Sequence, residues 1–371
     1  MERRKFLKYT TATIVIAGIT YYLSTDTSNF ERADLQESYK TIIPILADEK
    51  EILELASLAP SGHNTQPWFI KYKKPYHWII CNDKSKWLSA VDPTQRETIL
   101  SIGAFVQNLE YAANNLGYNC DFNLLATNNQ AEEILIVRLV KRSNIPKFDI
   151  QKIRNRRTLR SNYLNDTIKE QDLNYLFENE IGSLHYFSPT SKEHEYLNEQ
   201  TINANKIQSY RNDAQIELSN WIRFSNNEVQ KYCDGLSVAS MEIDGISAWI
   251  VRNFYDKRNV IKKDFRDKSI DTIKKQVAQS GGWIIITSPD NSVFSLLETG
   301  KRLQRIWLKA HEKNIAIHPM TQILEEVKTR DLINISIGII ENIQFLLRVG
   351  YVKNYPKPVT LRRPIAWFMK S

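Results

Sequence analysis

The chain has 371 residues, of which 42% are hydrophobic and 25% are charged, and its formal net charge is +8. This composition is typical of a globular protein, and the length suits two domains or one domain built from two halves. The basic residues form no long run interleaved with aromatics, so nucleic acid is not an expected partner. Neither the widely spaced Cys81, Cys120 and Cys233 nor the histidines form a metal-binding motif, so we expect no metal.

The first residues, MERRKFLKYTTATIVIAGITYYL, join a basic segment to an apolar stretch from Tyr9 to Leu23. We predict a targeting segment over residues 1–25 and a polar linker over residues 26–44. RRKFLK resembles the twin-arginine export signal, in which paired arginines precede Phe-Leu-Lys, and this resemblance implies export to the periplasm. The alternative is an uncleaved anchor in the inner membrane, because no small-x-small cleavage site follows the apolar stretch.

A helix-like apolar run ends at LAPSGHNTQPW, residues 58–68, and strand-like FIKY follows it. Pro60 and Gly62 break the helix, so we predict an ordered connection at this point. The stretch also suits an ordinary helix-to-strand turn that needs Pro and Gly geometry. Ser61 and His63 are close in sequence, but no acidic third member is evident nearby, which disfavours a hydrolase triad.

A strand followed by a helix occurs twice in the chain. The first copy is HWIIC with ILSIGAFVQNLEYAANNLGY, and the second is GWIII with LLETGKRLQRIWLKAHEKNI. Aligning Gly103 with Gly300 matches the apolar stripes of both helices and places Gly117 opposite Asn314, two residue types that end helices. A glycine inside a helix costs about 1 kcal/mol relative to alanine, so we expect the two helices to pack closely there. The alternative is two unrelated amphipathic helices.

We therefore predict two α+β halves, residues 45–148 and 149–371, that pair as two subunits would. They are not equivalent: LAPSGHNTQPW has no counterpart in the second half, and IRNRRTLRSNY, from Ile153 to Tyr163, has none in the first. An Asn-rich, charged stretch of about 188–265 is interpreted as an insertion. It is either a solvated helical excursion or a lid over a site. The lid alternative rests on three of its side chains, Trp221, Met241 and Trp249.

Two arginine clusters are candidates for anion binding. Arg156, Thr158 and Arg160 alternate in sequence, so in an extended segment the two guanidinium groups and the hydroxyl share one side. Planar guanidinium groups beside a hydroxyl suit a phosphate. VTLRRP supplies a second pair, Arg362 and Arg363. Taken alone, each cluster also fits a solvent-facing basic patch.

Three motifs together resemble one family. APSGHNTQPW resembles the APSxxNxQPW loop of the nitroreductase family of FMN-dependent oxidoreductases, and RRTLR resembles its RRSxR flavin-phosphate motif. LLRVGYVKNYPKPVTLRRP resembles its C-terminal segment, and the tandem arrangement resembles the single-chain Acg-type branch. The resemblance implies a nitroreductase-like α+β fold with central, mostly antiparallel sheets flanked by helices. It also implies a monomeric pseudo-dimer of two fused halves, whereas the family normally forms homodimers with two FMN molecules at the interface.

The resemblance also implies which residues bind FMN. Those matched to the phosphate site are Arg156, Thr158, Arg160 and one of Arg362 and Arg363. Those matched to the loop against the isoalloxazine ring are Pro60, Ser61 and Asn64. Lys274 is matched to a lysine near the flavin pyrimidine. The loop IHPMTQ brings three more ring-contact candidates, His318, Pro319 and Met320, with ordinary loop packing as the alternative. No catalytic side chain is implied, and His63 receives no role.

The implied reaction is ping-pong hydride transfer, from NAD(P)H or another electron donor through FMN to a nitro compound, quinone or similar small acceptor. Each site needs both RRTLR and APSGHN, so we expect one FMN per chain. An alternative is a flavin-binding or flavin-sequestering protein with a covered site and little turnover, because a lid and the loss of the second site would limit access to the flavin. The scarcity of NAD(P)H in the periplasm adds to this alternative. A membrane-anchored interaction module without cofactor is a third hypothesis.

Overall fold

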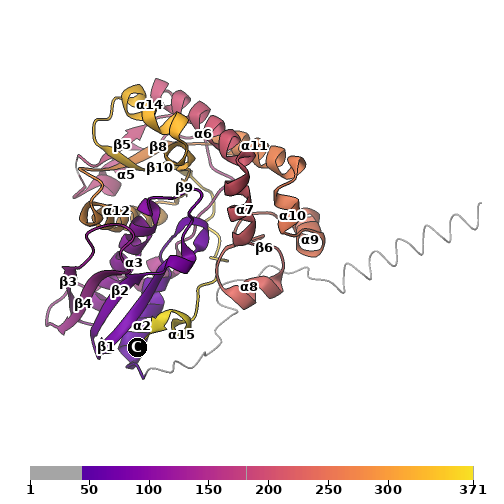
Figure 1. The fold of residues 1–371 in the computed structure, drawn as a ribbon. Coiled ribbons are helices and arrows are strands. Elements are labelled where there is room, and N and C mark those ends of the chain that lie inside the picture. Colours follow the sequence, from indigo (N-terminus) through magenta and orange to yellow (C-terminus); the bar gives the residue numbers. More distant parts are fainter. Residues whose placement is uncertain (1–43, 181, 371) are drawn as a thin grey trace, which may run out of the picture.

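The computed structural model describes residues 44–180 and 182–370. The predicted targeting segment, residues 1–25, and all but the last residue of the predicted linker lie outside the described residues. Two sheets with helices between and around them form the body of the molecule (Figure 1), so the predicted α+β class is confirmed. Within the described ranges, no helix combines the length and apolar character needed to span a membrane.

The first sheet has the strand order β11-β1-β2-β4-β3. Its strands are β1 (Trp68–Lys74), β2 (His77–Asn82), β3 (Tyr118–Leu124), β4 (Glu133–Lys141) and β11 (Met369–Lys370). The strands predicted from FIKY and HWIIC are therefore confirmed as β1 and β2. All neighbours are antiparallel except β11, which runs parallel to β1 and pairs Met369 with Ile70. The end of the chain thus returns to the sheet built by the first half.

The second sheet is antiparallel throughout and has the order β5-β8-β10-β9. Its strands are β5 (Leu184–Phe187), β8 (Gly282–Ser288), β9 (Ile315–Pro319) and β10 (Asn342–Tyr351). The strand predicted from GWIII is confirmed as β8, in which every residue is buried. A fully buried strand needs apolar or small side chains on both of its faces, which explains the continuous run in the sequence.

The two repeated helices pack against each other at their glycines. They are α3 (Arg96–Asn115) and α12 (Val293–Glu312). A Cβ atom on Gly103 would lie 2.2 Å from the carbonyl oxygen of Leu297, and one on Gly300 would lie 2.0 Å from that of Leu100. The predicted close contact is therefore confirmed. Gly117 and Asn314 follow these helices with φ of 79° and 51°, as predicted from their residue types.

One core joins the halves. Its buried side chains include Ile80 of the first sheet, Phe105 of α3, Trp307 of α12 and Leu347 of the second sheet. The other body helices are α2 (Ala47–Ser57), α4 (Ile150–Asn155), α5 (Glu170–Phe177), α13 (Gln322–Glu325), α14 (Val327–Ile337) and α15 (Ile365–Phe368). Since apolar residues of both halves share this core, we expect the halves to fold and unfold together.

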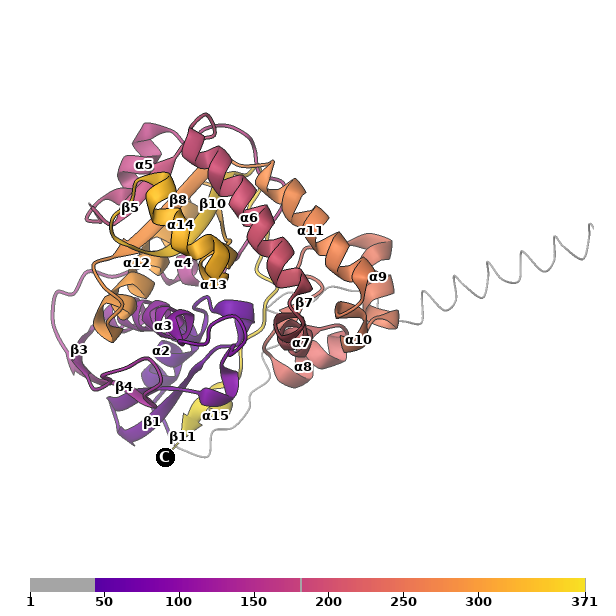
Figure 2. The same ribbon diagram turned by 45° about the horizontal axis from the view of Figure 1, so that its top comes forward.

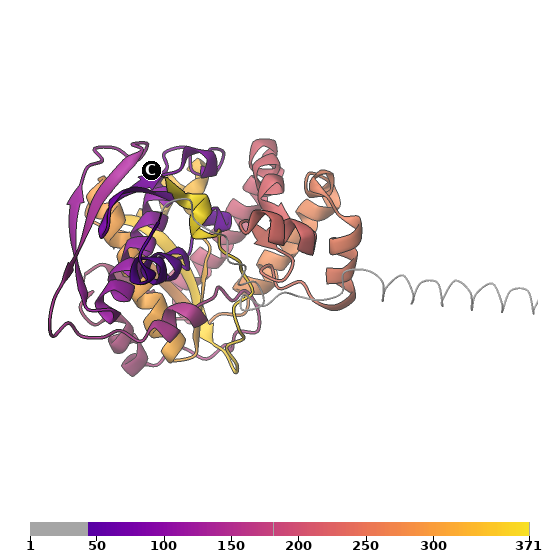
Figure 3. The same cartoon turned by 90° about the horizontal axis from the view of Figure 1, so that it is seen from below.

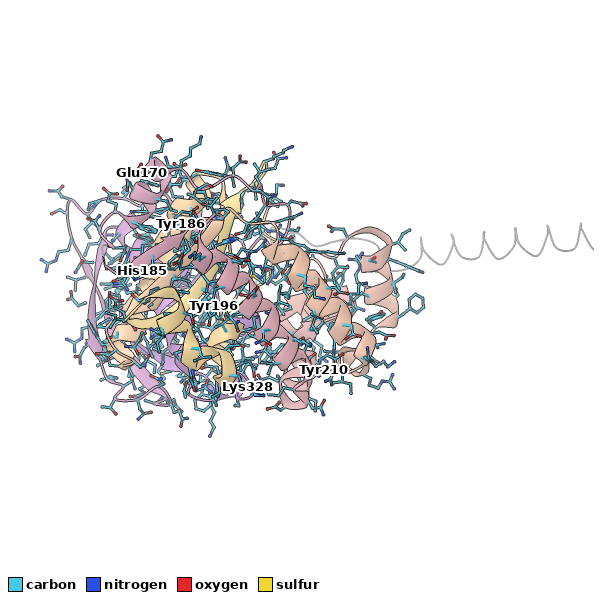
Figure 4. The ribbon with its side chains drawn as sticks, turned by 90° about the horizontal axis from the view of Figure 1, so that it is seen from above. Glu170, His185, Tyr186, Tyr196, Tyr210 and Lys328 are labelled. Atoms are coloured by element: carbon cyan, nitrogen blue, oxygen red, sulfur yellow. The ribbon has the colours of Figure 1, made fainter. Side chains whose placement is uncertain are left out.

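The predicted insertion divides into two parts in the structure. Helix α6 (Lys192–Tyr210) packs against α11 (Lys263–Val277), α13 and α14, on the second half. Residues 212–260, here called the wing, stand beside the body (Figures 2 and 3). The wing contains α7 (Asn212–Trp221), β6 (Ile222–Arg223), α8 (Asn226–Tyr232), β7 (Leu236–Ser237), α9 (Gly245–Phe254) and α10 (Lys257–Val260). Tyr210, labelled in Figure 4, lies where α6 ends, and its hydroxyl donates to Asp267 of α11.

The wing reaches across to the first half. Glu217 of α7 accepts hydrogen bonds from the backbone amides of Ala90 at 2.8 Å and Val91 at 3.2 Å. Lys86 forms an ion pair with Asp234 at 2.8 Å. The wing is part of the second half in sequence, but its contacts with Ala90, Val91 and Lys86 attach it to the first half. It therefore spans the joint between the halves.

Candidate functional site

The loop after α2 has an unusual backbone. A 3-10 turn (Gly62–Asn64) occupies its centre, and His63, Asn64 and Gln66 have φ of 46°, 55° and 55°. Left-handed backbone at three non-glycine residues is disfavoured, so the surroundings must hold it in place. The amide of Gln66 donates to Ser61 Oγ at 3.0 Å, and the Gln66 side chain is fully buried. The predicted ordered connection is confirmed.

The arginine segment follows α4 and has extended backbone where that helix ends. Arg156 is buried, its Nη2 donates to the Leu58 carbonyl at 2.7 Å, and its guanidinium lies 4.9 Å from the ring centre of Trp307. Burial lowers the pKa of Arg156 to about 10, which leaves the group charged at neutral pH. Arg160 donates from Nη1 to the Ser240 carbonyl at 2.6 Å, and burial lowers its pKa as well.

These two segments and the C-terminal segment meet at a cavity of about 80 Å³. The predicted residues that line it are Pro60, Ser61, Asn64, Arg156, Thr158, Arg160 and Arg362. The other lining residues are His63, Arg157, Leu236, Ser240, Val359 and Thr360. One cavity therefore contains side chains from both halves and from the wing.

The cavity is strongly cationic. Four arginines line it, and among the described residues Glu242 is an acidic neighbour of one of them, with Oε1 3.8 Å from Nη2 of Arg157. Arg156 Nε, Arg157 Nε and Asn64 Oδ1 are buried and have no hydrogen-bond partner among the described residues. The two Nε atoms are donors on buried cations, which are costly without a counter-charge, so the arginines fit an anionic group with several acceptor oxygens. Asn64 Oδ1 is an acceptor and would instead take a hydrogen from a donor.

Backbone atoms of the wing bond the loop that lines the cavity. Gln66 Nε2 donates to the Cys233 carbonyl at 2.9 Å, and Asn64 exchanges hydrogen bonds with the backbone of Gly235 at 3.2 Å. On the other side, Glu242 Oε1 accepts from the Arg160 amide at 2.9 Å, and Glu242 also bonds the Ser161 hydroxyl. Residues 233–242 are therefore attached to both motifs at once.

Comparisons with known proteins agree with these motifs. A model of the nitroreductase family matches residues 153–351, which is more than half of the chain. The chain belongs to the nitroreductase family. It is 21% identical over 295 residues to the "Probable NAD(P)H nitroreductase PigM" of a Serratia strain, covering 75% of this chain and 81% of that protein.

A second relative of this nitroreductase-family chain is the "Putative NAD(P)H nitroreductase acg" of Mycobacterium tuberculosis. It is 24% identical over 344 residues, which covers 85% of this chain and 93% of that protein. This extent supports the Acg-type branch predicted from the tandem arrangement. A solved nitroreductase from Bacteroides fragilis with bound FMN matches with a TM-score of 0.32 at 14% identity, over 57% of this chain and 94% of that one.

Five candidate residues of this nitroreductase-family chain lie outside the cavity lining. Lys274 is on the outer face of α11, where its side chain is 55% exposed and pairs with Asp271 at 3.0 Å. The match of Lys274 to a flavin-binding lysine is therefore not supported by its position. Arg363 is buried elsewhere, and its Nη2 donates to the carbonyls of Gln66 and Trp68. Arg363 shapes the loop behind the cavity rather than facing the space within it.

The IHPMTQ candidates belong to the second sheet and its core. Met320 is 1% exposed among apolar side chains, and Pro319 pairs with Leu347 in the sheet. His318 is buried with its Nδ1 3.5 Å from Nη2 of Arg348. Burial and two nearby arginines lower the pKa of His318 well below its usual value. None of the three lines the cavity, so ring contact by these residues stays a prediction.

The three side chains on which the lid alternative rests pack within the protein and do not reach the cavity. Trp221 packs with Leu88 and Val91 where the wing meets the first half. Met241 packs in a small core of the wing, and Trp249 is on α9, so none of the three lines the cavity. The wing does contribute to the cavity lining, but it does so through Leu236 and Ser240.

Arg348 positions the arginine segment and was not identified from the sequence. It is fully buried in β10, and its guanidinium donates to the carbonyls of Gln276, Gln279 and Arg160. The first two carbonyls are at the end of α11, where helices leave acceptors without internal partners. The signal in the sequence is a single arginine inside the apolar run LLRVGY.

A buried acidic cluster lies behind the loop. Thr321 Oγ1 is 3.0 Å from Oε1 of Glu97 and 3.0 Å from Oε1 of Glu325. One hydroxyl hydrogen serves one acceptor, so the second contact requires a protonated carboxyl. Burial and the charge of Glu97 raise the pKa of Glu325 to about 8. Glu97 Oε2 also lies 3.3 Å from where a Cβ of Gly62 would be, so the cluster supports the loop.

His63 faces the cavity as a neutral side chain. Burial and the charge of Arg160 lower its pKa to about 4, so the ring is uncharged at neutral pH. In the described ranges, no group of three or more His, Cys, Asp or Glu side chains is arranged to hold a metal ion.

Proposed function

We propose that this chain is an FMN-dependent oxidoreductase that binds one FMN in the cationic cavity. The observation that carries the proposal is the arginine-lined cavity in which both family motifs meet, with buried donors that lack partners among the described residues. A phosphate group would supply the missing negative charge and acceptor oxygens. The relatives' names, each of which contains the words NAD(P)H nitroreductase, support the oxidoreductase class and a nicotinamide donor. The choice of FMN rests on the resemblance of the two motifs to the family's flavin-binding motifs.

The lining suggests how the cofactor is held. Phosphate contacts are proposed for Arg156, Thr158, Arg160 and Arg362. Flavin-ring contacts are proposed for Pro60, Ser61 and Asn64, with Leu236 and Val359 supplying apolar surface. Bound FMN would supply two-electron transfer between a nicotinamide donor and a small acceptor such as a nitro compound or quinone, so no protein nucleophile is required. The guanidinium groups would stabilise negative charge in the site.

The cavity is composed of parts that occur once. The loop Pro60–Asn64 comes from the first half and the segment Arg156–Arg160 from the second, and neither has a counterpart in the other half. We therefore propose one FMN per chain. Flavin absorbance against protein concentration should give a ratio near one, and a ratio near two would contradict this count.

The double variant Arg156→Ala/Arg160→Ala tests the phosphate site. Each guanidinium that bonds a phosphate contributes about 1.5–3 kcal/mol, so FMN binding should weaken at least about 100-fold. Fluorescence titration of the flavin-free protein measures the affinity, and Lys274→Ala is the matched control because Lys274 is exposed on α11. Unchanged FMN affinity in the double variant would contradict the proposed phosphate site. An equal loss of affinity in the control would show that the effect is not specific to the cavity arginines.

A second candidate function is a flavin-binding protein with little turnover. It is favoured by the attachment of residues 233–242 to both motifs, because a wall held by several hydrogen bonds restricts access to the cavity. Stopped-flow mixing of the yellow protein with NADH or NADPH separates the two. Bleaching of the flavin, followed by reoxidation with quinones or nitroaromatics, would support the oxidoreductase. A flavin that no donor reduces would favour the binding protein.

We also propose export by the twin-arginine route, with the protein in the periplasm and its N-terminus able to remain as a membrane anchor. The support is RRKFLK followed by the apolar stretch Tyr9–Leu23. Fractionation of cells that express the full chain tests this localisation. Replacement of Arg3 and Arg4 by lysine should keep the protein in the cytoplasm, and unchanged localisation would contradict the proposal.

A further inference from the structure

Helix α9 carries an apolar stripe on the outside of the wing. Ile246, Ile250 and Phe254 are spaced by four residues, and their exposed fractions are 71%, 39% and 56%. Residues at this spacing lie on one face of a helix. Ala248 and Arg252 are buried, so the inner face of α9 is the one that packs against the wing. The stripe is therefore the outer face of an amphipathic helix.

The chain that follows α9 has a further exposed apolar residue and several basic residues. Ile261, after α10, is 44% exposed. From Asp244 to Lys268 the chain has seven basic and four acidic residues. Exposed basic side chains in this segment include Lys257, Arg258, Lys262 and Lys263. A short helix with apolar residues on one face and basic residues around it is the pattern of helices that lie in the interface of an anionic membrane.

The position of the stripe agrees with such a contact. Helix α9 lies at the outer side of the wing (Figure 2), away from the first sheet, and none of its residues lines the cavity. A membrane on this face would therefore leave the cofactor cavity uncovered. Scattered exposed apolar residues are normal, but several on one helical face indicate a contact surface.

The chain outside the described residues gives a reason for a membrane to be nearby. The basic residues Arg3, Arg4, Lys5 and Lys8 precede the apolar stretch Tyr9–Leu23. Residues 24–43 connect this stretch to the folded part, and twenty residues in any conformation reach at most about 70 Å. A chain held at the bilayer by its N-terminus would keep α9 at a high local concentration near the lipid, so a weak contact would suffice.

We propose that the outer face of α9, with the basic residues around α10, rests on an anionic membrane surface when the chain is held there by its N-terminus. In this arrangement the surface contacts the lipid interface. Ile246, Ile250 and Ile261 enter the headgroup region, and the basic side chains contact lipid phosphates. The proposal concerns a surface outside the FMN cavity, so it does not depend on cofactor binding, but it rests on the proposed membrane anchoring of the N-terminus.

The test uses the full chain in vesicles of phosphatidylcholine with about 30 mol% phosphatidylglycerol, a composition that provides anionic charge. An environment-sensitive fluorophore is attached to Ile246→Cys in a Cys120→Ser background, since Cys81 and Cys233 are buried. The matched control carries the label at Asn123→Cys on β3, at the far end of the molecule from the wing (Figure 1). Quenchers attached to the lipids report contact with the bilayer.

We expect a blue shift and strong quenching at position 246 and neither at position 123. Both signals should fall in about 0.5 M salt, where the Debye length is short, and in vesicles of phosphatidylcholine alone. Ile250→Glu should reduce the signal at position 246 while flavin reduction stays unchanged. Equal quenching at both positions would overturn the proposal. A blue shift without lipid would also overturn it, because a protein segment or a second copy would then cover the stripe.

Discussion

The two halves contact each other through similar helices, but the loops that they place at the joint are different. Helices α3 and α12 have the same length, cross at Gly103 and Gly300, and are followed by residues in the left-handed conformation. The loop with left-handed backbone lies only before the first sheet, and the arginine segment only before the second. The symmetric parts therefore hold the halves together, and the unequal parts build the cavity. Three substitutions test this division, in order of expected effect.

Gly300→Ala should damage the symmetric joint most. The added Cβ would lie 2.0 Å from the Leu100 carbonyl oxygen, so the helices must separate. We expect a loss of about 3 kcal/mol in the free energy of unfolding, measured by chemical denaturation. Gly338→Ala is the control, because Gly338 has φ of 68° but no atom within 4 Å of the added Cβ. The control should lose about 1 kcal/mol. Equal losses would mean that the helix contact is not close.

Gln66→Ala should damage the unequal part, with a smaller effect on stability. It leaves the buried Cys233 carbonyl and the amide of Arg363 without their partner. We expect a loss of about 2 kcal/mol, together with weaker FMN binding because the loop and the wing separate. The exposed Gln130→Ala is the control and should change stability by less than about 0.5 kcal/mol. Normal FMN affinity in Gln66→Ala would show that the loop does not depend on the wing.

Glu325→Gln should have the smallest effect, and its sign should depend on pH. The pKa of Glu325 is raised from 4.5 to about 8, so the folded state binds a proton that the unfolded state releases. The stability of the native protein therefore falls as pH rises from about 4.5 to about 8. The amide of glutamine keeps the bonds to Gln208 and Thr321 without a charge.

Glu325→Gln should accordingly be close to wild type at pH 5 and more stable than wild type at pH 8, as judged by denaturant midpoints. Glu326→Gln is the neighbouring control. That substitution removes an ion pair with Arg211 at 3.0 Å, so it should not stabilise the protein at either pH. A Glu325→Gln variant whose difference from wild type is the same at both pH values would show that Glu325 is ionised in the folded state.

The parts of the site that could be predicted are those whose residue types are unusual in sequence. Pro60 and Gly62 predict the loop, because both residues break helices. The alternation of Arg156 and Arg160 predicts that their guanidinium groups share one side, and both line the cavity. Arg157 also lines the cavity, although strict alternation would turn it away, because this segment has no strand partner to enforce a pleat. The packing of the two helices could be predicted from glycines at equivalent positions, because a glycine destabilises a helix unless a close contact requires it.

The other contacts of the site could not be predicted, because most of them are made by backbone atoms. The wing binds the loop through the carbonyls of Cys233 and Gly235, which no side chain reveals. The aromatic residues suggested a lid, yet Trp221 packs where the wing meets the body. Lys274 was matched through the family resemblance, and such a match does not show which face of α11 is exposed. Arg348 acts on three carbonyls that become neighbours only in the folded chain.

The crossing of α3 and α12 has a consequence for how the protein behaves on dilution. In a homodimer, a site shared by two subunits disappears when the subunits dissociate, so its occupancy depends on protein concentration. Here the same kind of joint lies within one chain, and the return of β11 to the first sheet adds a second link. Cofactor affinity should therefore be the same at nanomolar as at micromolar protein concentration.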